Sequence, residues 1–97
     1  METKEQYINR LSEFKKKRGI IYGINRIGIF GSVAKGKQTQ NSDIDIYYEG
    51  RPLSLFKMAA LKTELETILN STVDIVRFRE SMNGLLKKNI INDGIFV

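Results

Sequence analysis

The chain has 97 residues, of which 41% are hydrophobic, and this size suits a single compact domain over residues 1–97. It contains no cysteine and no histidine, which excludes disulfide frameworks, Cys/His zinc sites and catalytic arrangements that need histidine. The formal net charge of +5 favours a polyanionic partner, such as a nucleotide, RNA or an acidic protein surface, without choosing among them.

The first predicted element is an amphipathic helix over residues 3–18. Its apolar residues recur at spacings of three and four: Tyr7, Ile8, Leu11 and Phe14. We expect the helix to end before Gly19, so that the basic run of residues 15–18 lies solvated in its last turn, where cations complement the helix dipole. Residues 20–24 either extend a strand or form a connection, and residues 26–30 are predicted to form a short buried strand.

After this strand, we expect a short helix over residues 32–35 and a polar loop over residues 36–42. Residues 43–48 form the second predicted strand. Ser54 is predicted to cap a helix over residues 55–69. The residues expected on the buried face of this helix are Leu55, Met58, Ala59, Leu61, Leu65, Ile68 and Leu69.

A third strand is predicted over residues 72–78, which are rich in β-branched residues. Ser81 is expected to cap a final helix before a short apolar tail at residues 95–97. The apolar residues of that helix are Met82, Leu85, Leu86 and Ile90. This order of elements predicts an α/β domain in which one small sheet is covered by helices.

No stretch of the sequence approaches the roughly 20 apolar residues of a membrane span. The first residues also lack the apolar core of a signal peptide. We therefore expect a cytoplasmic protein that has no contact with a membrane.

Two carboxylates lie two positions apart in an apolar run with strand character, Ser42-Asp43-Ile44-Asp45-Ile46. Successive side chains on a strand point to opposite faces, so Asp43 and Asp45 share one face, with Cα atoms about 6.6 Å apart, while the isoleucines enter the core. At an effective dielectric constant of about 20, their repulsion is roughly 2 to 3 kcal/mol. The pair must be solvated at a sheet edge, share a proton or hold a cation. Of these, a bound divalent cation also gives the pair a function.

A third carboxylate, Asp74, lies inside the third predicted strand. An isolated carboxylate in a strand is costly unless it reaches solvent, a donor or a metal, and a structural salt bridge to Arg77 is the alternative interpretation. If the third strand pairs with the second, Asp74 joins Asp43 and Asp45. Three such groups are enough to hold two divalent ions about 3.5 to 4 Å apart, an arrangement that catalyses in-line displacement at phosphorus.

The Gly31-Ser32 turn supplies a complementary phosphate-binding element. Glycine lets the backbone approach a phosphate closely, and the amides at the start of a helix attract negative charge. Ser32 adds a hydroxyl donor, although it could instead be a simple helix cap. Lys35 and Lys37 are candidates to neutralise a triphosphate, with a solvated loop as the alternative.

These residues together resemble the nucleotidyltransferase superfamily that includes DNA polymerase beta and the aminoglycoside nucleotidyltransferases. The specific part of the resemblance is carried by Gly31, Ser32, Asp43, Asp45 and Asp74, and Lys35 stands where arginine is frequent. The short chain resembles the minimal members, the antitoxins of MNT/HEPN modules. The resemblance implies a nucleotidyltransferase fold with a small mixed sheet of three to four strands flanked by helices.

The resemblance further implies that Asp43 and Asp45 bridge the metals and that Asp74 completes the metal site and helps to activate an attacking hydroxyl. Gly31, Ser32 and Lys35 would hold the nucleoside triphosphate. The implied cofactors are two Mg²⁺ ions, or Mn²⁺, and the implied substrate is ATP. The implied reaction moves AMP to a hydroxyl of a partner protein, with pyrophosphate leaving.

The implied partner is a HEPN-type toxin or another helical protein, because larger relatives carry a further domain that this chain lacks; a homodimer is a second way to supply those surfaces. The alternative function is a catalytically silent binding module that neutralises a partner protein by contact. RNA binding without chemistry ranks last, because basic and aromatic residues are not interleaved.

Overall fold

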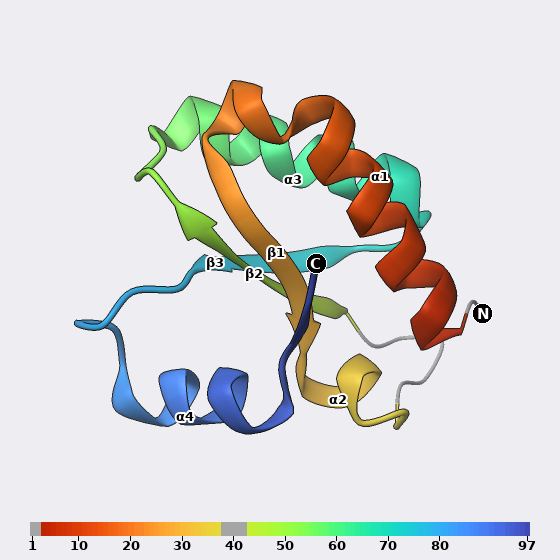
Figure 1. The fold of residues 1–97 in the computed structure, drawn as a ribbon, viewed down its shortest axis with the longest axis vertical. Helices are drawn as coiled ribbons and strands as arrows, with labels where there is room; N and C mark the ends of the chain where they lie inside the picture. Colours follow the sequence, from red (N-terminus) through yellow and green to blue (C-terminus); the bar gives the residue numbers. More distant parts are fainter. Residues whose placement is uncertain (1–2, 38–42) are drawn as a thin grey trace.

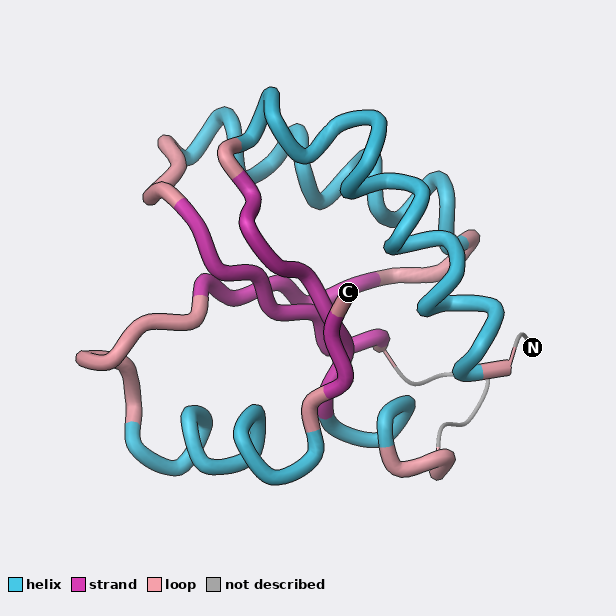
Figure 2. The backbone as a smooth tube through the Cα atoms, in the orientation of Figure 1, coloured by secondary structure: helices cyan, strands magenta, loops and turns pink. Residues whose placement is uncertain are grey.

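The computed structural model describes residues 3–37 and 43–97. It contains a four-stranded mixed sheet with helices on both faces, as Figures 1 and 2 show. The elements in chain order are α1 (Lys4–Tyr22), β1 (Ile24–Phe30), α2 (Gly31–Ala34), β2 (Ile44–Gly50), α3 (Leu55–Leu69), β3 (Val73–Arg77), α4 (Gly84–Asp93) and β4 (Ile95–Phe96). The strand order is β3-β2-β1-β4. β1 runs antiparallel to β2 and β4, and β2 runs parallel to β3.

This architecture confirms the predicted α/β class and the small mixed sheet flanked by helices. Residues 38–42 of the predicted polar loop lie outside the described residues. Among the described residues, no helix has both the length and the apolar character needed to cross a membrane.

α1 begins with a capping box, in which the backbone N–H of Gln6 donates to the Thr3 hydroxyl and the Gln6 side chain accepts from the N–H of Thr3. The prediction that this helix ends before Gly19 was wrong, because α1 continues for another turn. Burial of Tyr22 stabilises that turn and outweighs the roughly 1 kcal/mol that a helical glycine costs. The helix ends at Gly23, whose φ of 66° is left-handed. The basic run of residues 15–18 therefore lies inside the helix and not in its last turn.

One face of the sheet packs against α1 and α3 and forms the larger core. Alternation along β2 directs Ile44, Ile46 and Tyr48 to this face, where each is at most 1% exposed. The helices contribute Leu11, Phe14, Leu61, Leu65 and Leu69. Both tyrosines at positions 47 and 48 are buried packing residues.

α3 starts after the Ser54 cap and ends at Leu69, as predicted. Its expected buried stripe was wrong in part, because Leu55 is 90% exposed and Ala59 is also exposed. At 100° per residue, these two lie roughly 90° and 130° from the centre of the seam that Leu61, Leu65 and Leu69 form. Met58 and Ile68 lie closer to that seam and pack against the core.

The other face of the sheet packs against α4 and forms a smaller core. Its buried members are Phe30, Tyr47, Met82 and Ile90. The cap of α4 is Asn83, whose side chain accepts from the N–H of Leu86 at 3.1 Å, so the prediction of Ser81 was wrong. Met82 is buried in the turn before the helix, which delays its start, and Leu85 is 70% exposed instead of packed.

The predicted apolar tail forms the edge strand β4, which pairs with Gly28 and Ile29 of β1. A glycine is required at position 28 because a Cβ there would lie 2.2 Å from the carbonyl oxygen of Ile95. β4 therefore closes the chain back onto the sheet after α4.

Candidate active site

Parallel pairing of β2 with β3 places Asp45 directly opposite Asp74. Neighbouring strands lie about 4.8 Å apart, so the two carboxylates are adjacent on one face of the sheet. This is the face that α4 covers, since Ile44 and Ile46 point the other way into the larger core. The pairing on which the predicted convergence depended is therefore present.

Asp43 lies immediately before β2 and is exposed. Its Oδ1 accepts a hydrogen bond from the hydroxyl of Thr72, the residue immediately before β3. The carbonyl of Thr72 also accepts from the N–H of Ile44 at 3.0 Å, which continues the parallel ladder by one step. Thr72 was not predicted as part of the site, although the register of parallel strands already places residue 72 beside residue 43.

Gly31 lies directly against the carboxylate of Asp45, where β1 ends and α2 begins. Its φ is +71°, and a Cβ on it would lie 2.3 Å from Oδ2 of Asp45. A side chain at position 31 is therefore excluded by conformation and by space. The predicted closeness of the glycine turn to the carboxylates has a direct structural cause, because Phe30 pairs with Asp45 across β1 and β2.

Ser32 lies half-buried in the first turn of α2. The residue at the cap position is Phe30, and no side chain caps this helix by a hydrogen bond, so the alternative interpretation of Ser32 as a helix cap was wrong. The Ser32 carbonyl accepts from the N–H of Lys37 at 2.8 Å and holds the start of the following loop. The Ser32 hydroxyl thus lies beside Gly31 without a role in capping.

The electrostatics of the site favour a cation. Burial raises the pKa of Asp45, and the neighbouring charges of Asp74 and then Asp43 raise it further. A carboxylate with a raised pKa gains either from a proton or from a metal ion placed beside it. The alternative of a salt bridge between Arg77 and Asp74 was wrong. The Nε of Arg77 donates instead to the Gly50 carbonyl at 2.8 Å, and Asp74 forms no ion pair with any described residue.

The two strand carboxylates open into a hollow of about 320 Å³. It is lined by Phe30, Asp45, Asp74, Ile75, Val76 and Leu86. The apolar walls were not predicted as part of the site, and Leu86 comes from α4, far along the chain. This hollow gives the carboxylates a partly apolar cleft in which their charges are less screened than in open water.

Lys35 and Lys37 lie after α2, near the Gly31-Ser32 turn. The Nζ of Lys35 forms an ion pair with Asp93 of α4 at 3.4 Å, while Lys37 is exposed. A phosphate bound by Lys35 would have to compete with Asp93. The ion pair also joins α2 to the far end of α4.

The oxygen donors of the cluster fit a hard divalent cation such as Mg²⁺ or Mn²⁺. Within the described ranges, no three acidic side chains already surround a common point. Asp45 and Asp74 are adjacent, whereas the Asp43 carboxylate is turned toward Thr72. Joint coordination by all three residues would thus require the Asp43 side chain to rotate away from the Thr72 hydroxyl.

A small mixed sheet with paired strand carboxylates and a glycine turn against them defines a class of nucleotide-transferring domain. The family model described as "Polymerase beta, Nucleotidyltransferase" matches residues 9–97. The chain belongs to this nucleotidyltransferase family, which is a family of enzymes.

A named relative and two solved structures agree with this assignment. The chain is similar to protein adenylyltransferase MntA of Thermococcus cleftensis, with 31% identity over 98 residues that cover 100% of this chain and 98% of that protein. It is similar to a chain of a toxin–antitoxin crystal structure with AMP-PNP, with a TM-score of 0.74, 29% identity, and coverage of 91% of this chain and 69% of that one.

It is also similar to a chain of the complex of the tri-AMPylated Shewanella oneidensis HEPN toxin with its MNT antitoxin. That TM-score is 0.65 and the identity 27%, with coverage of 94% of this chain and 70% of that one.

Proposed function

We propose that this protein transfers AMP from ATP to a hydroxyl group of a HEPN-type toxin and thereby acts as the antitoxin of the pair. The observation that carries the proposal is the in-register pairing of Asp45 with Asp74, with Gly31 packed against the Asp45 carboxylate. Family membership and the MntA relative support the reaction class. The HEPN toxin in one similar structure supports the kind of partner.

In the proposed reaction, an oxygen of the acceptor hydroxyl attacks the α-phosphorus of ATP. A new phosphorus–oxygen bond forms, the bond between the α-phosphorus and the bridging oxygen to the β-phosphate breaks, and pyrophosphate leaves. Asp74 is proposed to take the proton of the attacking hydroxyl, because it is exposed and lines the hollow, where an acceptor can reach it. Asp45, which also lines the hollow, would bind a metal ion that offsets the charge developing on the phosphate.

Asp43, Asp45 and Asp74 are the residues that would hold the metal. Bound Mg²⁺ or Mn²⁺ would offset the negative charge of the phosphates and of the developing transition state. The contribution of the chain is to keep two carboxylates adjacent at a rigid sheet. The Thr72 hydroxyl donates to Asp43, and this hydrogen bond would be given up if Asp43 joined Asp45 and Asp74 on a metal ion.

Gly31, Ser32 and Lys35 are proposed to hold the triphosphate. The absence of a side chain at position 31 leaves backbone exposed next to the carboxylates, and the Ser32 hydroxyl is free to donate. Lys35 would exchange Asp93 for phosphate oxygens when the nucleotide binds. The proposed use of ATP supports a cytoplasmic location, and a single domain over residues 1–97 is proposed to carry the site.

The test is to incubate the protein with labelled ATP, Mg²⁺ and a HEPN-type protein. Wild type should label the partner, and Asp45→Asn should not. Label from another nucleoside triphosphate would correct the nucleotide. Equal neutralisation of the partner by wild type and Asp45→Asn, without label, would instead support the silent module that acts by contact.

A further inference from the structure

Four large apolar side chains are exposed at the adjoining ends of α1 and α3. Ile20 and Ile21 lie in the last turn of α1 and are 89% and 42% exposed. Leu55 and Phe56 form the start of α3 and are 90% and 91% exposed. We call these four residues the corner patch. Adjacent Leu and Phe side chains almost wholly in water are unusual in a small domain and indicate an interaction surface.

The two halves of the corner patch are far apart in sequence but side by side in space. The end of α1 and the start of α3 occupy the same corner in Figures 1 and 2. The N–H of Arg51 donates to the Gly23 carbonyl at 3.2 Å, and the Nζ of Lys57 lies 5.9 Å from the centroid of the Tyr22 ring. These contacts fix one segment against the other, so the patch is a built feature of the fold.

The patch is bordered by cations that have no acidic partner. Lys16 precedes Ile20 by one helical turn, and Arg51 and Lys57 flank the other half of the patch. Within the described part of the chain, none of these three side chains pairs with a carboxylate. The nearby acids Glu13 and Glu64 are already paired with bases of α1.

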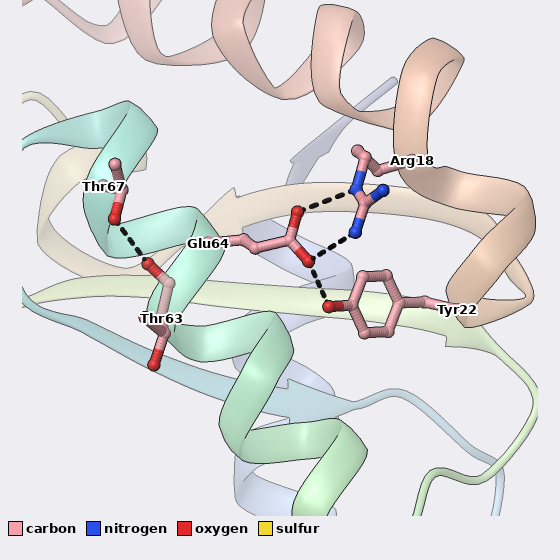
Figure 3. Close-up of polar contacts among 5 residues, drawn as sticks. All are labelled: Arg18, Tyr22, Thr63, Glu64 and Thr67. Carbon is pink, nitrogen blue, oxygen red and sulfur yellow. Dashed lines mark hydrogen bonds and ion pairs between the residues drawn. The ribbon is translucent and has the colours of Figure 1, made fainter.

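A hollow of about 350 Å³ lies in the same layer, between α1 and α3. Phe14, Arg18 and Ile68 are among the residues that line it. Figure 3 shows Arg18 reaching from α1 to Glu64 of α3, and these two residues hold the helices together beside the hollow. The surface is thus long enough for a helix that crosses from the patch toward the middle of the layer.

We propose that the outer face of α1 and α3, from the corner patch to this hollow, is the docking surface for an acidic amphipathic helix of the partner protein. Apolar side chains of that helix would cover Leu55, Phe56 and Ile20, and its carboxylates would meet Lys16, Arg51 and Lys57. A second copy of this chain is a poorer occupant, because its own three cations would then face the same three cations and repel them. The identity of the partner as a HEPN-type protein rests on the proposed function.

This surface lies on the opposite side of the sheet from the acidic cleft (Figure 1). Docking there leaves the cleft open to nucleotide. Docking of this helix on the patch is therefore independent of ATP, of Mg²⁺ and of the carboxylates, whereas the acceptor hydroxyl of the partner must still reach the cleft. The docking affinity is set by the patch and by the ionic strength.

The test is to titrate the HEPN-type partner protein into wild type and variants by isothermal titration calorimetry, with gel filtration of each protein alone. Phe56→Ser removes an exposed aromatic anchor without touching the core, and it should weaken binding at least about tenfold. Arg51→Glu combined with Lys57→Glu should weaken it by a similar factor, more at low salt than at high salt. The matched control is Leu85→Ser, which removes an exposed leucine of α4 and should change affinity less than about twofold.

Binding of Phe56→Ser within about twofold of wild type would overturn the proposal, as would a wild-type dimer that Phe56→Ser dissociates. Loss of affinity in Leu85→Ser with no loss in Phe56→Ser would move the docking surface to α4 and also overturn it. Asp45→Asn separates the two proposals. If this variant binds the partner normally and transfers no AMP, both proposals stand, and if wild type binds through the patch yet transfers no AMP, only the proposed function fails.

Discussion

The two faces of the sheet in this protein differ in what their side chains contribute. The face under α1 and α3 is filled by aliphatic and aromatic residues that are almost wholly buried, and the ion pair of Arg18 with Glu64 joins the two helices above it. The face under α4 has a smaller core, a hollow and two adjacent carboxylates. In this 97-residue chain, the larger hydrophobic core thus lies on one side of a single sheet and the candidate active site on the other.

The largest expected effect tests this division with one leucine from each face. Leu65→Ala removes a side chain with 0% exposure under α3 and should destabilise the protein by about 2 to 5 kcal/mol. Leu86→Ala trims the partly exposed wall of the cleft and should cost less than about 1.5 kcal/mol. Urea unfolding followed by circular dichroism measures both free energies. Equal losses would show that the two faces share the stability.

Glycine 31 is expected to give the next largest effect. Gly31→Ala places a Cβ on the Asp45 carboxylate in a left-handed conformation, so it should cost at least about 2 kcal/mol and abolish AMP transfer. Gly36→Ala is the matched control, because Gly36 has a similar φ of +72° with nothing within 4 Å of its Cβ. That variant should cost only about 1 kcal/mol. The same loss in both variants would assign the whole effect to the backbone conformation.

Glu64 provides a smaller effect on the α1–α3 face. Its hydrogen bond from Arg18 lowers its pKa, and the hydrogen bond from Tyr22 lowers it further against the effect of burial. The ionised form therefore stabilises the fold above the unfolded pKa, and this contribution is lost as the pH falls through the folded pKa. Glu64→Gln should lower the stability at pH 7 by less than about 1 kcal/mol, because the pair is partly exposed. Melting curves from pH 7 to pH 3 should show the difference shrinking.

Asp45, on the other face, should have the opposite effect on the pH dependence of stability to that of Glu64, and this effect is the smallest. Its pKa is raised by burial, Asp74 and Asp43, so the ionised form is destabilising above the folded pKa and the penalty is absent below the unfolded pKa. Asp45→Asn should therefore melt slightly higher than wild type at pH 7 without metal, and equally at low pH. Mg²⁺ should raise the melting temperature of wild type more than that of the variant. A lower melting temperature of the variant at pH 7 without metal would contradict this account.

Local patterns in the sequence predicted which side chains of β2 point to each face of the sheet and where α3 begins. The Asp43-Ile44-Asp45-Ile46 alternation places Asp45 and the core isoleucines correctly, whereas Asp43 lies just before the strand, and Ser54 marks the first residue before α3. Such features depend on the period of a strand or on a cap within a few residues. They are decided locally, so a single sequence contains them.

The errors came from residues whose role depends on distant contacts. Gly19 lies inside α1 because the helix continues to Tyr22, whose side chain is buried in the core. The residues next to Gly19 in the sequence do not indicate that burial. Leu55 is exposed because the seam of α3 is set by the sheet beneath it. Thr72 and Leu86 reach the site only through strand pairing and through the return of α4 over the sheet. Their contribution follows from topology.

The short edge strand β4 attaches the end of α4, and with it one wall of the cleft, to the sheet. Among the described residues, Gly28 and Ile29 of β1 pair with β4, and backbone hydrogen bonds between Val97 and Ile27 extend this attachment. α4, which precedes β4, is attached to the sheet and to α2 by the smaller core and by the ion pair of Lys35 with Asp93. A unit with so few bonds opens at a lower free energy than the layer of α1 and α3. Amide protons of residues 84–96 should therefore exchange before those of α3, and breathing of this segment would admit the nucleotide without unfolding the molecule.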